Sequence, residues 1–192
     1  MSDKYLDTDL FDRAAILAIK AHHNIERRDK GFPYIIHPME AAEIVATITN
    51  DQELLAAAIL HDVVEDTEIT VEEIRSEFGD RVAELVANES DLVVEGKSAS
   101  ESWHERKQFA IDRLAAASTD VKIVAMGDKL SNMRAIARDY EAIGDELWNR
   151  FHVTEVGEHE WHYRGLAESL RELGGTDAYI EFLMLINRVF SH

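Results

Sequence analysis

The sequence predicts an all-helical protein, and three observations support this fold class. No segment alternates apolar and polar residues in the way a half-buried strand does, whereas most of the chain repeats apolar residues at helical spacing. The 192 residues include only two prolines and nine glycines, which is little material for a protein of strands and turns. Internal repeats and coiled-coil heptads are absent. We therefore expect one helical domain over residues 1–192.

The first two helices are expected over residues 10–28 and 37–49. Apolar residues recur at helical spacing in the first segment. Pro33 predicts a loop between the two helices, because the residue before proline avoids helical backbone angles. Pro38 suits the first turn of the second helix, where its missing N–H is not needed.

A buried central helix is expected over residues 53–64. This segment is apolar on most sides, which is typical of a helix surrounded by others, and Asn50 or Asp51 can cap its start. After it, Thr70 and Glu73 have the spacing of a capping box and predict a short helix that ends at Gly79.

The second half of the chain continues the helical pattern. Residues 81–88 resume a helix after Gly79, and the polar stretch 95–102 predicts an exposed, mobile loop. Asp120 is expected to cap the helical segment 121–125. Further helices are expected over residues 103–117, 121–125, 128–140, 141–151, 158–173 and 176–190.

Composition excludes several classes of protein. The chain has no cysteine, so it has no disulfide, thiolate metal site or cysteine nucleophile. A net charge of −18 argues against a nucleic-acid polymer as partner. The acidic N-terminus lacks the apolar core of a signal peptide, and no apolar run approaches the ~18 residues of a membrane span. We expect a cytoplasmic protein that does not bind membranes.

The segment Leu60-His61-Asp62-Val63-Val64-Glu65-Asp66 is the strongest functional signal in the sequence. It places an imidazole and three carboxylates inside an apolar helical run. Residues three and four apart share a helix face, so His61 is expected above Glu65 and Asp62 above Asp66. This pattern predicts half of a metal-dependent phosphohydrolase site.

Two other segments offer ligands beside apolar residues. His37 stands at a predicted loop-to-helix junction, and Asp128 interrupts an apolar run with Asn132 four residues later. Without thiolates, a hard or borderline divalent cation takes imidazole nitrogen and carboxylate oxygen. A phosphate-bearing substrate would also need basic partners against the net charge of −18, for which Arg28, Lys30, Lys129 and Arg134 are the candidates.

The order of these ligands resembles the signature of the HD superfamily of phosphohydrolases. The match is closer to the hydrolase domain of RelA/SpoT homologues, which include small stand-alone alarmone hydrolases. It is carried by AHHNIERRDKGFPYIIHPMEAA, AAAILHDVVEDT, ITVEEIRSEFGDRVAELV, ERK and MGDKLSNMR, which keep the family's order. The resemblance implies an HD-domain helical bundle with a motif-bearing core at about residues 9–140 and C-terminal helices 141–192 packed on it.

The resemblance also implies roles for individual residues. It makes Glu65 and Asp66 the catalytic acidic pair, Asn132 a site asparagine and Arg28 part of the nucleotide pocket. It implies that Mn²⁺, or another divalent metal, is held by His37, His61, Asp62 and Asp128.

The implied reaction is release of pyrophosphate from the 3′ position of guanosine 3′,5′-bis(diphosphate), abbreviated ppGpp. One departure concerns base recognition, because Asp29 stands where the family commonly has a pocket lysine, with Lys30 one position later. Two alternatives therefore stay open: an HD phosphohydrolase acting on another nucleotide or phosphorylated cofactor, and a non-catalytic nucleotide sensor. A homo-oligomer is also possible.

Several other residues invite a functional interpretation that we do not favour. His159 and His162 are three apart rather than the four of the HExxH zinc motif, and we expect them on a partly exposed helix face. His22 is expected to pack near the site. Trp148 is expected to be a core or interface aromatic.

Overall fold

The computed structural model describes residues 6–27, 30–90, 94, 96–98 and 100–191. Within these ranges the regular secondary structure is helical, apart from one isolated β-bridge between Glu26 and Pro33. The predicted all-helical class is confirmed. The chain divides into two compact units, residues 1–90 and 91–192. No helix in the described ranges combines the length and the apolar character needed to cross a membrane.

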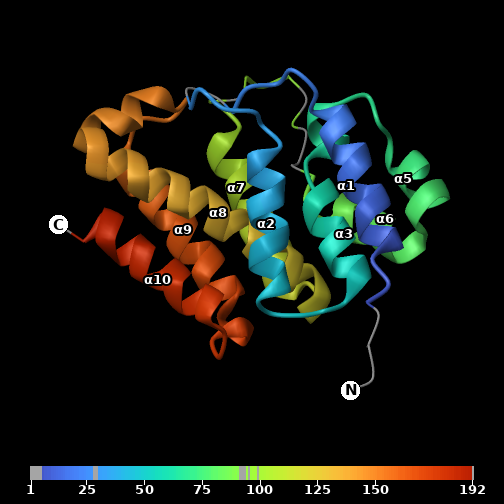
Figure 1. Ribbon diagram of the computed structural model, residues 1–192. Helices are drawn as coiled ribbons and strands as arrows, with labels where there is room; N and C mark the ends of the chain where they lie inside the picture. The colour runs from blue at the N-terminus through green and yellow to red at the C-terminus, as the bar shows by residue number, and fades with distance from the viewer. Residues whose placement is uncertain (1–5, 28–29, 91–93, 95, 99, 192) are drawn as a thin grey trace. The chain divides into compact units, whose positions relative to one another are not determined.

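The first unit is built around α3, which contacts α1, α2 and α6 (Figure 1). Leu54, Ile59 and Leu60 of α3 are almost fully buried, as expected for a central helix. The Asp51 side chain caps α3 by accepting a hydrogen bond from the N–H of Glu53 at 2.9 Å. The helices of this unit are α1 (Asp9–Ala21), α2 (Ile36–Ala46), α3 (Gln52–Leu60), α4 (Val63–Asp66), α5 (Val71–Phe78) and α6 (Asp80–Ala87).

Helix α1 ends seven residues before the expected residue 28. The reason is the backbone of Asn24, whose φ of 63° is left-handed and cannot continue a right-handed helix. The chain then turns back, and Glu26 forms the isolated bridge with Pro33. The N–H of Tyr34, two residues before α2, bonds to the carbonyl of Ile25 at 2.8 Å.

The expected helix 53–64 is interrupted at His61 and Asp62. Both residues lie in a turn between α3 and α4, although the N–H of Asp66 still bonds to the carbonyl of Asp62 at 2.9 Å. The two predicted ligands His61 and Asp62 therefore lie at a helix junction rather than in the middle of a continuous helix.

The expected start and end of α5 are confirmed. The Thr70 hydroxyl accepts from the N–H of Glu73 at 3.2 Å, and the Glu73 carboxylate accepts from the N–H of Thr70 at 2.8 Å. Gly79 has a φ of 92°, which a residue with a side chain rarely adopts, and it ends α5 and begins α6.

In the second unit, α8 contacts α10, and α9 contacts both α7 and α10 (Figure 1). The expected loop 95–102 lies partly outside the described residues. The helices of this unit are α7 (Trp103–Ala116), α8 (Thr119–Ile143), the 3-10 helix η1 (Gly144–Arg150), α9 (Val156–Ser169), the 3-10 helix η2 (Arg171–Leu173) and α10 (Asp177–Phe190).

Helix α8 is one helix of 25 residues where the sequence analysis expected two. The helix continues through Gly127, because a single glycine costs only about 1 kcal/mol in a helix interior and burial of the surrounding apolar residues can offset that. The cap is Ser118 rather than Asp120, because the Ser118 hydroxyl accepts from the N–H of Val121 at 3.4 Å. The segment 141–151 forms the end of α8 and then η1, not a separate α-helix.

The expectation of a partly exposed face at His159 is wrong. His159 is only 3% exposed, and its ring stacks on that of Trp148, which is 2% exposed and belongs to the core as expected. Its Nε2 lies 2.8 Å from the carbonyl of Val153. Burial lowers the pKa of His159, and it lowers that of His162 well below the usual range. Both histidines belong to an aromatic cluster of the second unit.

Candidate metal centre

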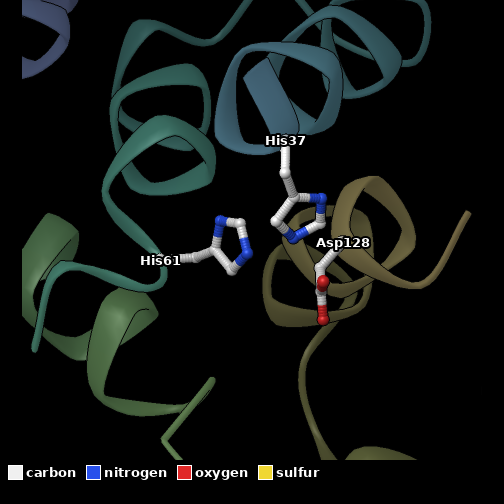
Figure 2. A group of neighbouring side chains, drawn as sticks. All are labelled: His37, His61 and Asp128. Carbon is white, nitrogen blue, oxygen red and sulfur yellow. The ribbon is translucent and has the colours of Figure 1, made fainter. Parts of the chain in front are cut away.

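His37 and His61 lie side by side in the first unit. His37 is in the first turn of α2, and His61 follows the last residue of α3. Their rings are edge to face with centroids 5.1 Å apart, and both side chains are buried (Figure 2). The contact between α2 and α3 therefore places two imidazoles together, as the predicted metal site requires.

The proton position on His61 is fixed by a backbone contact. Its Nδ1 lies 2.8 Å from the carbonyl oxygen of Ala58. Because a carbonyl only accepts, Nδ1 carries the proton and a neutral imidazole presents a lone pair at Nε2. Histidine ligands of metals are commonly oriented by such a second contact.

A carboxylate oxygen of Asp62 points toward the Nε2 atoms of His37 and His61. Its Oδ2 is 3.0 Å from Nε2 of His61 and 3.5 Å from Nε2 of His37. Without a cation, the lone pairs of this oxygen and of the histidine nitrogens would face and repel each other. Two ligand atoms that are each about 2.1 Å from one ion, at an angle of about 90° at the ion, are roughly 3 Å apart. The donor set and its spacing therefore fit a divalent cation.

Tyr34 was not assigned a role from the sequence, yet it contacts the predicted ligand Asp62. Its hydroxyl donates a hydrogen bond of 2.7 Å to Oδ2 of Asp62. Burial, followed by the charge of Asp62, raises the pKa of Tyr34 far above its usual value, so the hydroxyl remains a donor. The buried ring of His22 packs against Tyr34 with centroids 4.8 Å apart, in agreement with its expected packing role.

Asp128 belongs to α8 of the second unit and is buried (Figure 2). Residues of its own helix hold both of its carboxylate oxygens. The Asn132 amide donates to Oδ1 and the Lys129 ammonium donates to Oδ2, each at 2.5 Å. The four-residue spacing of Asp128 and Asn132 therefore produces the shared face that the sequence predicted.

Glu65 and Asp66 lie on the short helix α4, immediately after the turn that holds His61 and Asp62. Both are exposed, in contrast to the buried histidines. Solvent can therefore reach both carboxylates, which follow the predicted ligands directly in the chain.

The predicted phosphate partners have different surroundings. Arg28 lies outside the described residues, and Lys30 is half-buried in the turn before Gly31. Arg134 forms a two-pronged ion pair with Glu181 of α10, with its Nε and one terminal nitrogen each 2.7 Å from a carboxylate oxygen. Sequence spacing gave no sign of this pair, because its members are 47 residues apart.

The chain is similar to known proteins over most of its length. A family model described as "HD domain" matches residues 14–151, a range that includes residues of both units. The chain is 36% identical over 168 residues to the guanosine-3′,5′-bis(diphosphate) 3′-pyrophosphohydrolase MESH1 of Danio rerio, covering 85% of this chain and 84% of the relative. It is 35% identical to the Homo sapiens MESH1 protein over 172 residues, which covers 88% and 87% of the two chains.

Two solved structures share the fold. One, reported under a title describing a metazoan orthologue of SpoT that hydrolyses ppGpp, superimposes with a TM-score of 0.74 at 24% identity and covers 96% of this chain and 97% of its own. The other, from Listeria monocytogenes EGD-e, gives a TM-score of 0.71 at 28% identity and covers 81% of this chain and 99% of its own.

Proposed function

The chain belongs to the HD-domain family, and from this membership we propose that it is a metal-dependent 3′-pyrophosphohydrolase of ppGpp. The MESH1 relatives that carry this activity in their names match nearly the whole chain. The observation that carries the chemistry is the convergence of His37, His61 and Asp62 on one point in the first unit.

We propose that His37, His61, Asp62 and Asp128 hold one divalent cation, and that this cation is Mn²⁺. All four offer imidazole nitrogen or carboxylate oxygen, and the histidines and Asp128 are buried. Because the ligands come from both units, the proposal also makes the units parts of one HD domain. The family match over residues 14–151 supports this.

When bound, such a cation lowers the pKa of a coordinated water and polarises a phosphoryl oxygen. The residues of the chain supply the remaining functions. Glu65 and Asp66 would orient the attacking water and accept its proton, because they are exposed carboxylates directly after two ligands. Asn132 and Lys129 would hold the Asp128 carboxylate in one orientation through their hydrogen bonds to its two oxygens.

Recognition of the phosphates requires positive charge in a chain whose net charge is −18. We propose Arg28, Lys30, Lys129 and Arg134 as the partners. A phosphate at Lys129 or Arg134 would share that side chain with the carboxylate of Asp128 or Glu181. The carboxylate is therefore expected to reduce the contribution of Lys129 and of Arg134 to phosphate binding.

A nucleotide panel tests the substrate assignment. Purified protein is incubated with ppGpp, its adenosine analogue and common mononucleotides, with Mn²⁺ or with a chelator, and the products are separated by chromatography. The proposal predicts guanosine 5′-diphosphate and pyrophosphate from ppGpp in the presence of Mn²⁺. Turnover of another nucleotide alone, with ppGpp left intact, would reject the guanosine substrate.

A further inference from the structure

The Tyr34 hydroxyl and the two histidines all meet Asp62 at the same oxygen. Oδ2 accepts the hydrogen bond from Tyr34 at 2.7 Å and is also the oxygen 3.0 Å from His61 and 3.5 Å from His37. A carboxylate on a single side-chain bond can turn about its last torsion. A donor on Oδ2 restricts that rotation and keeps this oxygen directed at the histidines.

Tyr34 can impose an orientation because its own position is fixed by several contacts. Its N–H donates to the carbonyl of Ile25 at 2.8 Å, across the turn closed by the bridge between Glu26 and Pro33. Its ring packs against the imidazole of His22, and the guanidinium of Arg27 lies 5.1 Å from the ring centroid. The phenol is therefore held at its backbone and at its ring, and its hydroxyl reaches Asp62 from a rigid base.

We propose that Tyr34 is a positioning residue of the metal centre, which holds Asp62 Oδ2 in the orientation that binds the cation. This inference rests on the proposed function, since it takes Asp62 as a ligand. Tyr34 itself need not touch the metal or the substrate. Contacts of this kind behind a ligand typically change metal affinity by about 10- to 100-fold.

The Tyr34→Phe variant tests the inference, because it removes the hydroxyl and keeps the ring that packs on His22. Mn²⁺ affinity of the purified, metal-free protein is measured by calorimetric titration or by competition with a chelating dye. We expect the dissociation constant to rise by about 10- to 100-fold. We also expect the reduced rate of the variant to recover at high Mn²⁺, which general damage to the fold would not allow.

Tyr179→Phe is the matched control. Tyr179 is a buried tyrosine whose hydroxyl is likewise a donor, but it bonds to the carbonyl of Ala167 in the second unit at 3.0 Å. Its loss is expected to lower thermal stability and to leave Mn²⁺ affinity unchanged.

The outcomes separate the two proposals. Wild-type binding of Mn²⁺ together with unchanged affinity in Tyr34→Phe would overturn the role of Tyr34 alone. A wild-type protein that binds no Mn²⁺ would overturn the proposed metal centre and the role of Tyr34 with it. Thermal unfolding of the metal-free Tyr34→Phe protein shows whether the variant is folded, and Tyr34→Leu, whose side chain has no hydrogen-bond donor, repeats the test if it is not.

Discussion

The Nδ1 of His61 donates a hydrogen bond to the carbonyl of Ala58, three residues earlier at the end of α3. This contact gives the lone pair of the neutral ring to Nε2, which faces Asp62 Oδ2 at 3.0 Å. The carbonyl of Ala58 at the end of α3 thus determines which nitrogen of His61 carries the proton, and the resulting arrangement favours a cation between His61 and Asp62, as proposed.

The Asp62→Asn variant should lose the cation without losing the fold. Its amide can donate a hydrogen bond to the lone pair of His61 Nε2, so the metal-free variant is expected to be at least as stable as the metal-free wild type. The wild type at 100 times its dissociation constant should gain about 2.7 kcal/mol from Mn²⁺, and the variant should gain almost nothing. Chemical unfolding with and without Mn²⁺ measures both values, and a variant still stabilised by Mn²⁺ would show that Asp62 is not a ligand.

Replacing Glu65 by Gln should separate catalysis from metal binding. Removal of a general base typically lowers the rate by about 10²- to 10⁴-fold, whereas the ligand set stays intact. Pyrophosphate release and Mn²⁺ affinity are measured on the same preparation. Glu68→Gln is the matched control, because Glu68 is an exposed glutamate three residues further on. Normal turnover in Glu65→Gln would remove Glu65 from the reaction.

The ion pair between Arg134 and Glu181 should make stability depend on pH. Hydrogen bonds from Arg134 lower the pKa of Glu181, against a smaller opposing effect of burial. A carboxylate with a lowered pKa in the folded state contributes stability above its unfolded pKa and loses it as the pH falls through the folded value. Because both side chains are partly exposed, Glu181→Gln should cost only roughly 0.5–1 kcal/mol near pH 7.

Urea unfolding of wild type and Glu181→Gln at several pH values checks this prediction. The two stability curves should converge at low pH, once Glu181 is protonated, which requires a pH below the usual pKa range of a glutamate carboxyl. A difference that stays constant down to that pH would mean that packing, and not the charge of the pair, holds α10 against α8.

Loss of the capping box should weaken the first unit in a defined way. Thr70→Ala removes the acceptor for the N–H of Glu73 and should lower the free energy of unfolding by about 1 kcal/mol. Thr70→Ser keeps a hydroxyl at this position and should lose much less. Equal losses in the two variants would attribute the effect to the methyl group of the threonine.

Local sequence signals were sufficient where a neighbouring residue determines the structure. The reciprocal bonds of Thr70 and Glu73 were predicted correctly, and the cap of α3, predicted at Asn50 or Asp51, is Asp51; both act within three residues. His37 and His61 were predicted as partners from their chemistry and from the family resemblance, and they lie side by side.

The sequence was insufficient where distant contacts decide. The continuity of α8 through Gly127 depends on tertiary packing, which local propensity does not include. The burial of His159 depends on Trp148, and the link from Tyr34 to Asp62 spans 28 residues. The sequence shows that Tyr34 lies three residues before the candidate ligand His37, but this position does not indicate that Tyr34 contacts Asp62.

The most direct test of the account is a Mn²⁺ titration of the metal-free protein in which bound metal and pyrophosphate released from ppGpp are measured together. The account predicts one Mn²⁺ per chain and a rate that rises in proportion to its occupancy, with both lost in Asp62→Asn. Pyrophosphate release at full rate by the chelated protein, or one bound Mn²⁺ with no release from ppGpp, would contradict it.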